Sequence, residues 1–192
     1  MPVIEVHLLE GYSGDDKRRL GEALTDATRL VVPASADLVT VMIHEMPASN
    51  YYRGRTSRSP APALADPCAI VEEFLQCLGN RDLERARTFV AEDFVMFFPA
   101  APAMHQFEEL IAWSKTRYRT IETTMEGIEA MHTAGEETVV YCRGTLSGTW
   151  TDGAPFSGIR FIDRFELIDG RITRQEVWND IAETQLSGRQ SL

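Results

Sequence analysis

At two positions in this sequence, a group that can carry a proton has surroundings that would shift its pKa. The first is Pro2, which directly follows the initiator methionine, whose removal would leave a secondary amine at the chain terminus. An α-amine titrates at about 7.7–8.0 in short peptides, and an apolar pocket lowers that pKa because burial disfavours the ammonium form. Pro2 is therefore a candidate general base near neutral pH, although Met-Pro also begins many ordinary proteins.

The second position is Asp163, which stands in a stretch of alternating residue types. Along residues 159–168 the alternation is typical of a strand with one buried side. The side that holds Asp163 also carries Ile159, Phe161, Phe165 and Leu167. Burial among these side chains would raise the pKa of the carboxyl and make it a candidate acid. The alternatives are a carboxylate paired with Arg143 or Arg160, and a buried acid whose hydrogen bonds are only structural.

The composition narrows the chemistry that these residues could serve. The 192 residues include 19 Lys or Arg and 29 Asp or Glu, a net charge of −10, which disfavours nucleic acid and anionic membranes as partners. No apolar run approaches the ~18 residues of a membrane span, and the first residues lack the features of a secretory signal. The three cysteines show no metal-ligand spacing and are typical of reduced thiols in a cytoplasmic protein. We expect a small-molecule substrate, with no metal and no other cofactor.

The elements that would position Pro2 are a strand, a helix and a second strand. Residues 3–9 alternate as a strand does, and Ser13 is a good N-cap for the amphipathic stretch that follows. Pro33 would end that helix, and the run 39–46 is again rich in β-forming residues. The order predicts a β-α-β unit with parallel strands. About 55 residues are marginal for an independent core, so we expect a homo-oligomer, whether dimer, trimer or hexamer.

This first segment resembles the 4-oxalocrotonate tautomerase family along its whole short subunit. The shared features are the terminal proline, the strand end Leu9-Glu10-Gly11, the helix length and the strand that ends in Glu45-Met46. The resemblance implies that Pro2 acts as acid and base on an enol or dienol. It also implies β-α-β subunits that pair and then assemble, commonly as hexamers.

The segment departs from this family at the positions that bind substrate. Two arginines that often hold the substrate carboxylates are replaced by Tyr12 and Thr40, which disfavours a dicarboxylic substrate. Tyr12 can still donate a hydrogen bond, and Tyr51 stands where the family has an aromatic pocket wall. Arg53 and Arg55, in a hairpin segment, could replace one lost charge, or could be solvated charges with no such role.

Residues 56–66 are rich in Ser, Pro and Ala and have no apolar period, which predicts a linker. The linker would separate a first domain, 1–55, from a second, 67–192. The second domain has helical patterns first and strand patterns afterwards, which predicts an α+β fold. The helices are expected at 68–78, 83–90 and 104–118, and the strands at 94–98, 124–132, 137–150, 156–168 and 171–180.

The order of these elements resembles the nuclear transport factor 2-like superfamily, which includes ketosteroid isomerase and the SnoaL-like polyketide cyclases. The resemblance covers roughly residues 66–185, and residues 161–172 running into Glu176-Val177-Trp178 are its better signal. It implies a cone-shaped α+β domain with a curved antiparallel sheet. It also implies roles for Asp163, as an acid that donates to a substrate oxyanion, and for Trp178. Phe74 and Phe98 stand where ketosteroid isomerase has its other oxyanion donor and its base.

Three further residues are candidates for substrate binding in the second domain. His105 opens the expected long helix and could act as acid or base, or could be an ordinary surface or capping residue. Trp113 and Trp178 could line a cavity for an aromatic or polyketide-like ligand, or could simply fill the core.

Three functions follow from these residues. The first is a keto-enol tautomerase that uses Pro2. The second is a polyketide cyclase-like or lyase reaction around Asp163, in which the first domain serves assembly. The third is a small-molecule binding protein without catalysis.

Overall fold

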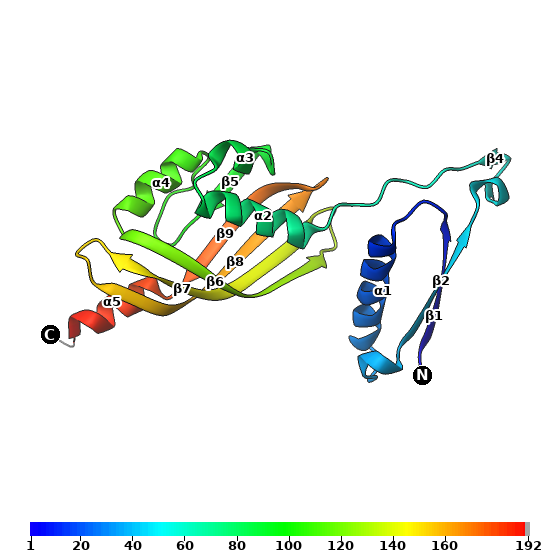
Figure 1. The fold of residues 1–192 in the computed structure, drawn as a ribbon, viewed down its shortest axis with the longest axis horizontal. Coiled ribbons are helices and arrows are strands. Elements are labelled where there is room, and N and C mark those ends of the chain that lie inside the picture. The colour runs from blue at the N-terminus through cyan, green and yellow to red at the C-terminus, as the bar shows by residue number, and fades with distance from the viewer. Residues whose placement is uncertain (191–192) are drawn as a thin grey trace. The chain divides into compact units, whose positions relative to one another are not determined.

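The computed structural model describes residues 1–190, with side chains described as far as Leu186. The chain forms two compact units, one of Met1–Ala63 and one that begins at Leu64 (Figure 1). The division falls inside the spacer predicted at residues 56–66. Thr56 and Ser57, which we assigned to that spacer, instead pair as the second strand of a hairpin.

The first unit is the predicted β-α-β unit. Strand β1 (Val3–Leu9) pairs in parallel with β2 (Thr40–Met46), in a register that places Val3 opposite Thr40. Helix α1 (Gly14–Arg29) connects them, and its N-cap is Ser13, whose hydroxyl accepts a hydrogen bond from the Asp16 amide at 3.1 Å. Short helical turns η1 (Ala36–Leu38) and η2 (Ala48–Asn50) flank β2, and the hairpin of β3 (Tyr52–Arg53) and β4 (Thr56–Ser57) follows.

The first unit has very little interior of its own. All of residues 1–63 are described, and none of their side chains is buried. The side of the two-stranded sheet that carries Glu5 also carries His7, whose ring stacks on His44 with 5.0 Å between centroids. Val3 and Met42, at the same side, are 55% and 37% exposed. A sheet of only two strands leaves this apolar surface uncovered, as expected for so short a chain.

The second unit places three helices over a five-stranded sheet (Figure 1). The strand order is β5-β9-β8-β7-β6. Its elements are α2 (Pro67–Gly79), α3 (Leu83–Arg87), β5 (Val90–Phe97), α4 (Phe107–Lys115), β6 (Tyr118–His132), β7 (Thr138–Trp150), β8 (Pro155–Ile168), β9 (Arg171–Asn179) and α5 (Ile181–Gln190).

The fold class agrees with the sequence analysis, and several details differ. Val90 and Tyr118, expected at the ends of helices, instead begin strands β5 and β6. Strands β6 to β9 are antiparallel, but β5 adds in parallel to β9, so the sheet is mixed. The helix expected from residue 104 begins at Phe107, because Met104 pairs with Met96 as a β-bridge. Helix α5, at the C-terminal end of the described chain, was not predicted; its apolar residues are too few to form a clear periodic stripe.

Phe74 of α2 is the centre of the core of the second unit. It is fully buried, and its ring lies 5.9–6.0 Å from the rings of Phe94, Phe107 and Phe165. These rings come from α2, β5, α4 and β8, so one cluster holds the helices against the sheet. Aromatic rings at this separation gain both buried area and favourable edge contacts.

Candidate functional site

The candidate site of the first unit is a cavity of about 430 Å³ at the C-terminal end of its strands. It brings together three of the predicted residues, Tyr12, Tyr51 and Arg53. The remaining lining residues are His7, Leu8, Leu9, Met46, Arg58, Ser59, Pro60 and Ala61. The cavity therefore combines aromatic and aliphatic walls with two guanidinium groups.

The chain closes this cavity by folding the spacer back on the end of β1. Gly11 has φ +134°, a conformation that favours glycine. A Cβ at Gly11 would stand 3.1 Å from Cγ of Pro60, so the turn and the spacer are in close contact here. The hairpin is also fixed, because the Ser57 hydroxyl donates to the Ala48 carbonyl at 3.2 Å.

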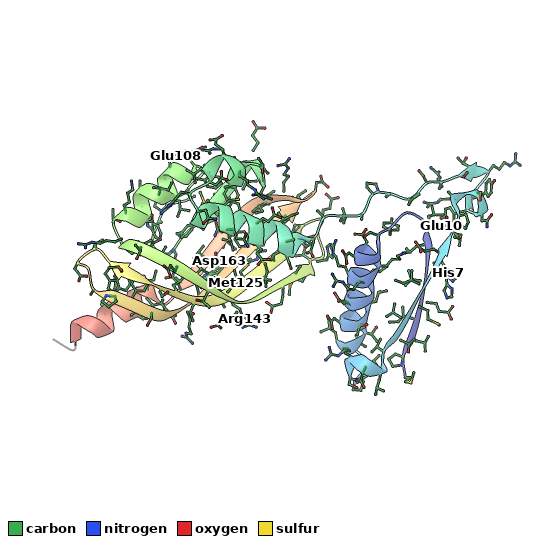
Figure 2. The ribbon with its side chains drawn as sticks, viewed as in Figure 1. His7, Glu10, Glu108, Met125, Arg143 and Asp163 are labelled. Atoms are coloured by element: carbon green, nitrogen blue, oxygen red, sulfur yellow. The ribbon has the colours of Figure 1, made fainter. Side chains whose placement is uncertain are left out.

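Pro2 and Thr40 lie together at the other end of the same strands. The Thr40 amide donates to the Pro2 carbonyl at 3.0 Å, and both residues are half-buried. Strand β1 runs between Pro2 and the cavity, and its seven residues span roughly 20 Å. Figure 2 shows His7 and Glu10 towards the end of the strand that is far from the N-terminus. A single chain therefore does not bring Pro2 to Tyr12, Tyr51 or Arg53.

The candidate site of the second unit is centred on Asp163, on the helix-covered face of β8. Its side chain is only 7% exposed, and Gln175 Nε2 donates to Asp163 Oδ2 at 3.1 Å. Burial raises the pKa of the Asp163 carboxyl from 3.8 to about 7, and the Gln175 hydrogen bond offsets part of that rise. A carboxyl with such a pKa can give and take a proton near neutral pH.

The surroundings of Asp163 are unusual for a purely structural acid. Arg143 and Arg160 pair with Glu129 (3.6 Å) and Asp180 (2.6 Å), so neither neutralises Asp163. Within the described residues, the amide oxygen Oε1 of Gln175 is buried without a hydrogen-bond partner. Cys142 stands opposite Asp163 on β7. Burial raises the pKa of the Cys142 thiol to about 12, with a further rise from the nearby carboxyl, so this thiol stays protonated.

The structure places Trp178 and His105 away from Asp163 and packs Trp113 against the core. Trp178 is 52% exposed on the opposite face of the sheet, because it follows Val177, which faces Asp163, and adjacent strand residues point to opposite sides. His105 is exposed beside a separate cavity of about 220 Å³. Trp113 is half-buried; its ring lies 5.1 Å from that of Phe98.

Comparison with known families assigns the two units separately. The model of the SnoaL-like domain family matches residues 71–175, more than half of the chain. The chain belongs to the SnoaL-like domain family. The model of the tautomerase enzyme family matches residues 2–59, the part that contains Pro2 and most of the lining of the first cavity. These matches support an activity of the isomerase or cyclase type.

Solved structures share the fold of the SnoaL-like domain. An NTF2-like protein of unknown function from Burkholderia pseudomallei K96243 is 22% identical with a TM-score of 0.50, over 62% of this chain and 95% of its own. TerC, co-crystallised with polyporic acid, is 17% identical with a TM-score of 0.50, over 62% of this chain and 96% of its own. A search of curated proteins found no match.

Two kinds of feature are absent from the described residues. No group of three or more His, Cys, Asp or Glu side chains there could hold a metal ion. No helix among them is both long enough and apolar enough to cross a membrane.

Sequence reasoning missed three residues at the two sites. Arg58 and His7 line the first cavity, and Gln175 bonds Asp163 in the SnoaL-like domain. The alternation of β9 could have placed Gln175 on the inner face with Val177. Nothing in the sequence marks Arg58, because its position depends on the spacer folding back towards Gly11.

Proposed function

We propose that this protein is a keto-enol tautomerase that uses Pro2, after removal of Met1, as its acid and base. The observation that carries the proposal is the cavity that gathers Tyr12, Tyr51 and Arg53 within the segment that matches the tautomerase family. The Pro2 amine takes the proton from the hydroxyl of an enol, and its ammonium form returns a proton to the carbon. The net change is one proton moved from oxygen to carbon, so no oxidant or reductant is needed.

The cavity residues have distinct parts in this reaction. The Tyr12 hydroxyl is a hydrogen-bond donor for the oxygen that carries negative charge during the transfer. The Arg53 guanidinium holds an anionic group of the substrate. Tyr51, with Leu9 and Met46, packs against the apolar part. Binding in this orientation leaves the enol free to meet an amine at the open side of the cavity.

The Pro2 amine that meets this cavity comes from a second copy of the chain. Within one chain, Pro2 and Tyr12 stand at opposite ends of the strand pair. The first unit also exposes apolar side chains that a second copy would cover, among them Val3, Leu38 and Tyr52 at 55%, 46% and 62%. We therefore propose a homo-oligomer in which each site combines residues of two copies.

The test combines intact mass with kinetics. The purified protein should have the mass of the chain without Met1, because a retained methionine would turn the Pro2 nitrogen into an amide. The Pro2→Ala variant should ketonise phenylenolpyruvate about 10²- to 10⁴-fold more slowly than the natural protein. The Pro33→Ala variant, in the loop after α1, should keep the natural rate. A retained methionine, or equal rates for the Pro2 variant, would refute the proposal.

A second candidate function rests on the buried Asp163, which has a pKa of about 7, and on Gln175, whose amide oxygen has no hydrogen-bond partner among the described residues. These groups support an acid–base step, such as a cyclase-like or lyase reaction, in the SnoaL-like domain. An activity lost in Asp163→Asn and kept in Pro2→Ala would favour this function. Tight ligand binding without turnover by either site would instead favour a non-catalytic binding protein.

A further inference from the structure

We propose that the first unit has an anion-binding pocket formed by Arg53 of the hairpin and Arg58 of the spacer, and that a bound ligand holds the start of the spacer in place. The ligand class is a small aromatic monocarboxylate. The inference deepens the proposed tautomerase function because it uses the same cavity, but it concerns binding and needs no turnover.

The charges that line the cavity favour an anionic ligand. Arg53 and Arg58 line it, and within the described residues neither makes an ion pair with a carboxylate. Arg18, Arg19 and Arg29, on α1, each pair with an acid; Arg18, for example, lies 2.9 Å from Glu22. Arg55 also makes no ion pair with a described residue, but it does not line the cavity. Two guanidinium groups at one cavity without a counter-charge favour an anion from outside the chain.

Nearby acids do not supply that counter-charge. Glu45 lies next to Met46 but is held by Lys17 at 2.8 Å. Glu10 follows Leu9 and is exposed (Figure 2), and neither acid lines the cavity. The positive charge of the two arginines therefore remains open to a ligand. Because both are exposed, solvent and salt screen their mutual repulsion in the empty pocket.

The uncharged part of the lining indicates what the anion is attached to. Tyr12 and Tyr51 provide aromatic faces, and Leu9, Met46 and Pro60 provide aliphatic surface. Such walls suit a flat apolar group, while the guanidinium fork suits the two oxygens of a carboxylate. One aromatic ring with one carboxylate matches both parts of the lining.

The spacer forms part of the pocket, so a bound ligand would also hold the start of the spacer in place. Residues 58–61 form one wall, and the contact between Gly11 and Pro60 fixes their approach to β1. A ligand that contacts Arg58 and Tyr12 together joins the spacer to the body of the first unit. Binding therefore restrains the chain at the start of the connection to the SnoaL-like domain.

Calorimetric titration with phenylacetate tests the pocket, and phenylacetamide is its uncharged control. We expect each of Arg53→Ala and Arg58→Ala to weaken phenylacetate binding about 3- to 10-fold, and the double variant about 10- to 100-fold. Arg55→Ala is the matched control, because Arg55 lies in the same hairpin and does not line the cavity. It should bind as the natural protein does. Phenylacetamide should bind weakly to every variant.

Elastase, which cleaves after small residues such as Ala63, tests the spacer. Phenylacetate should slow cleavage of the spacer in the natural protein and in Arg55→Ala, but not in Arg58→Ala. Phenylacetate binding that the double variant retains in full would overturn the pocket. Tight binding with unchanged cleavage would overturn the restraint.

The same variants separate this inference from the proposed function. Pro2→Ala should still bind phenylacetate, because the variant keeps both guanidinium groups of the cavity and still has an amine at the chain terminus. If binding depends on the arginines while ketonisation does not depend on Pro2, the pocket stands and the tautomerase proposal fails. If ketonisation depends on Pro2 while binding does not depend on the arginines, the pocket fails and the tautomerase proposal stands.

Discussion

Replacement of Asp163 by Asn should stabilise the protein at alkaline pH and have little effect at acidic pH. In the folded state the pKa of Asp163 is raised from 3.8 to about 7, mainly by burial. The folded state therefore disfavours the carboxylate that the unfolded chain accepts freely. The asparagine variant has no such ionisation, and its side-chain oxygen can still accept the hydrogen bond from Gln175.

The size and direction of the effect follow from this pKa difference. Each pKa unit is worth about 1.36 kcal/mol, so the difference corresponds to about 4 kcal/mol. A raised acid pKa contributes stability that is fully present below the unfolded pKa, near 4, and is lost as pH rises through about 7. The variant should therefore exceed the natural protein in free energy of unfolding by up to about 4 kcal/mol at pH 8, and by little at pH 4.

Urea unfolding at a series of pH values measures this difference. Asp93→Asn, the same substitution at an exposed position of β5, is the matched control. A stability difference for Asp163→Asn that does not change with pH would refute the reasoning. It would mean that Asp163 is ionised as readily in the folded protein as in the unfolded chain.

Three further predictions concern the core and the cysteines. Gly144→Ala should destabilise the SnoaL-like domain by about 1–3 kcal/mol in a thermal melting experiment, because the new Cβ would meet the Thr124 carbonyl and the Phe161 ring. Gly79→Ala is the control and should have a much smaller effect, because a Cβ at Gly79 would have nothing within 4 Å. Phe74→Ala should cost about 3–5 kcal/mol in urea unfolding, and a loss below 1 kcal/mol would contradict a central role for this ring. In a Cys68→Ser variant the two remaining thiols, both buried, should react with Ellman's reagent only after unfolding.

The fold followed from the sequence wherever periodicity and local signals agreed. The alternation of residues 3–9, the N-cap at Ser13 and the alternation of residues 159–168 each predicted an element that the structure contains. The parallel position of β5 beside β9 did not follow, because the pairing of distant strands leaves no local pattern. Met104 was assigned to a helix for a similar reason, since its bridge to Met96 is a tertiary contact.

The sites were predictable in part, for reasons that differ between residues. The alternation of β8 placed Asp163 on the inner face, where it lies. Trp178 was placed by resemblance to a family, whereas the alternation of its own strand sends it outward. The lining of the first cavity was less predictable. Arg58 reaches it only because the spacer turns back, and Pro2 lies outside it because strand β1 separates the two.

The length of strand β1 affects how inactivating mutations in two copies of the gene would combine. Pro2 and the cavity stand at opposite ends of β1, so a substitution at either end leaves the other group intact in the same chain. If active sites form between copies, a chain that lacks Pro2 still has its cavity, and a chain that lacks the cavity arginines still has Pro2. The intact cavity of the first chain and the Pro2 of the second can then form one working site. Two inactive alleles would then restore activity together in one cell, and the functional unit would be a pair of gene products.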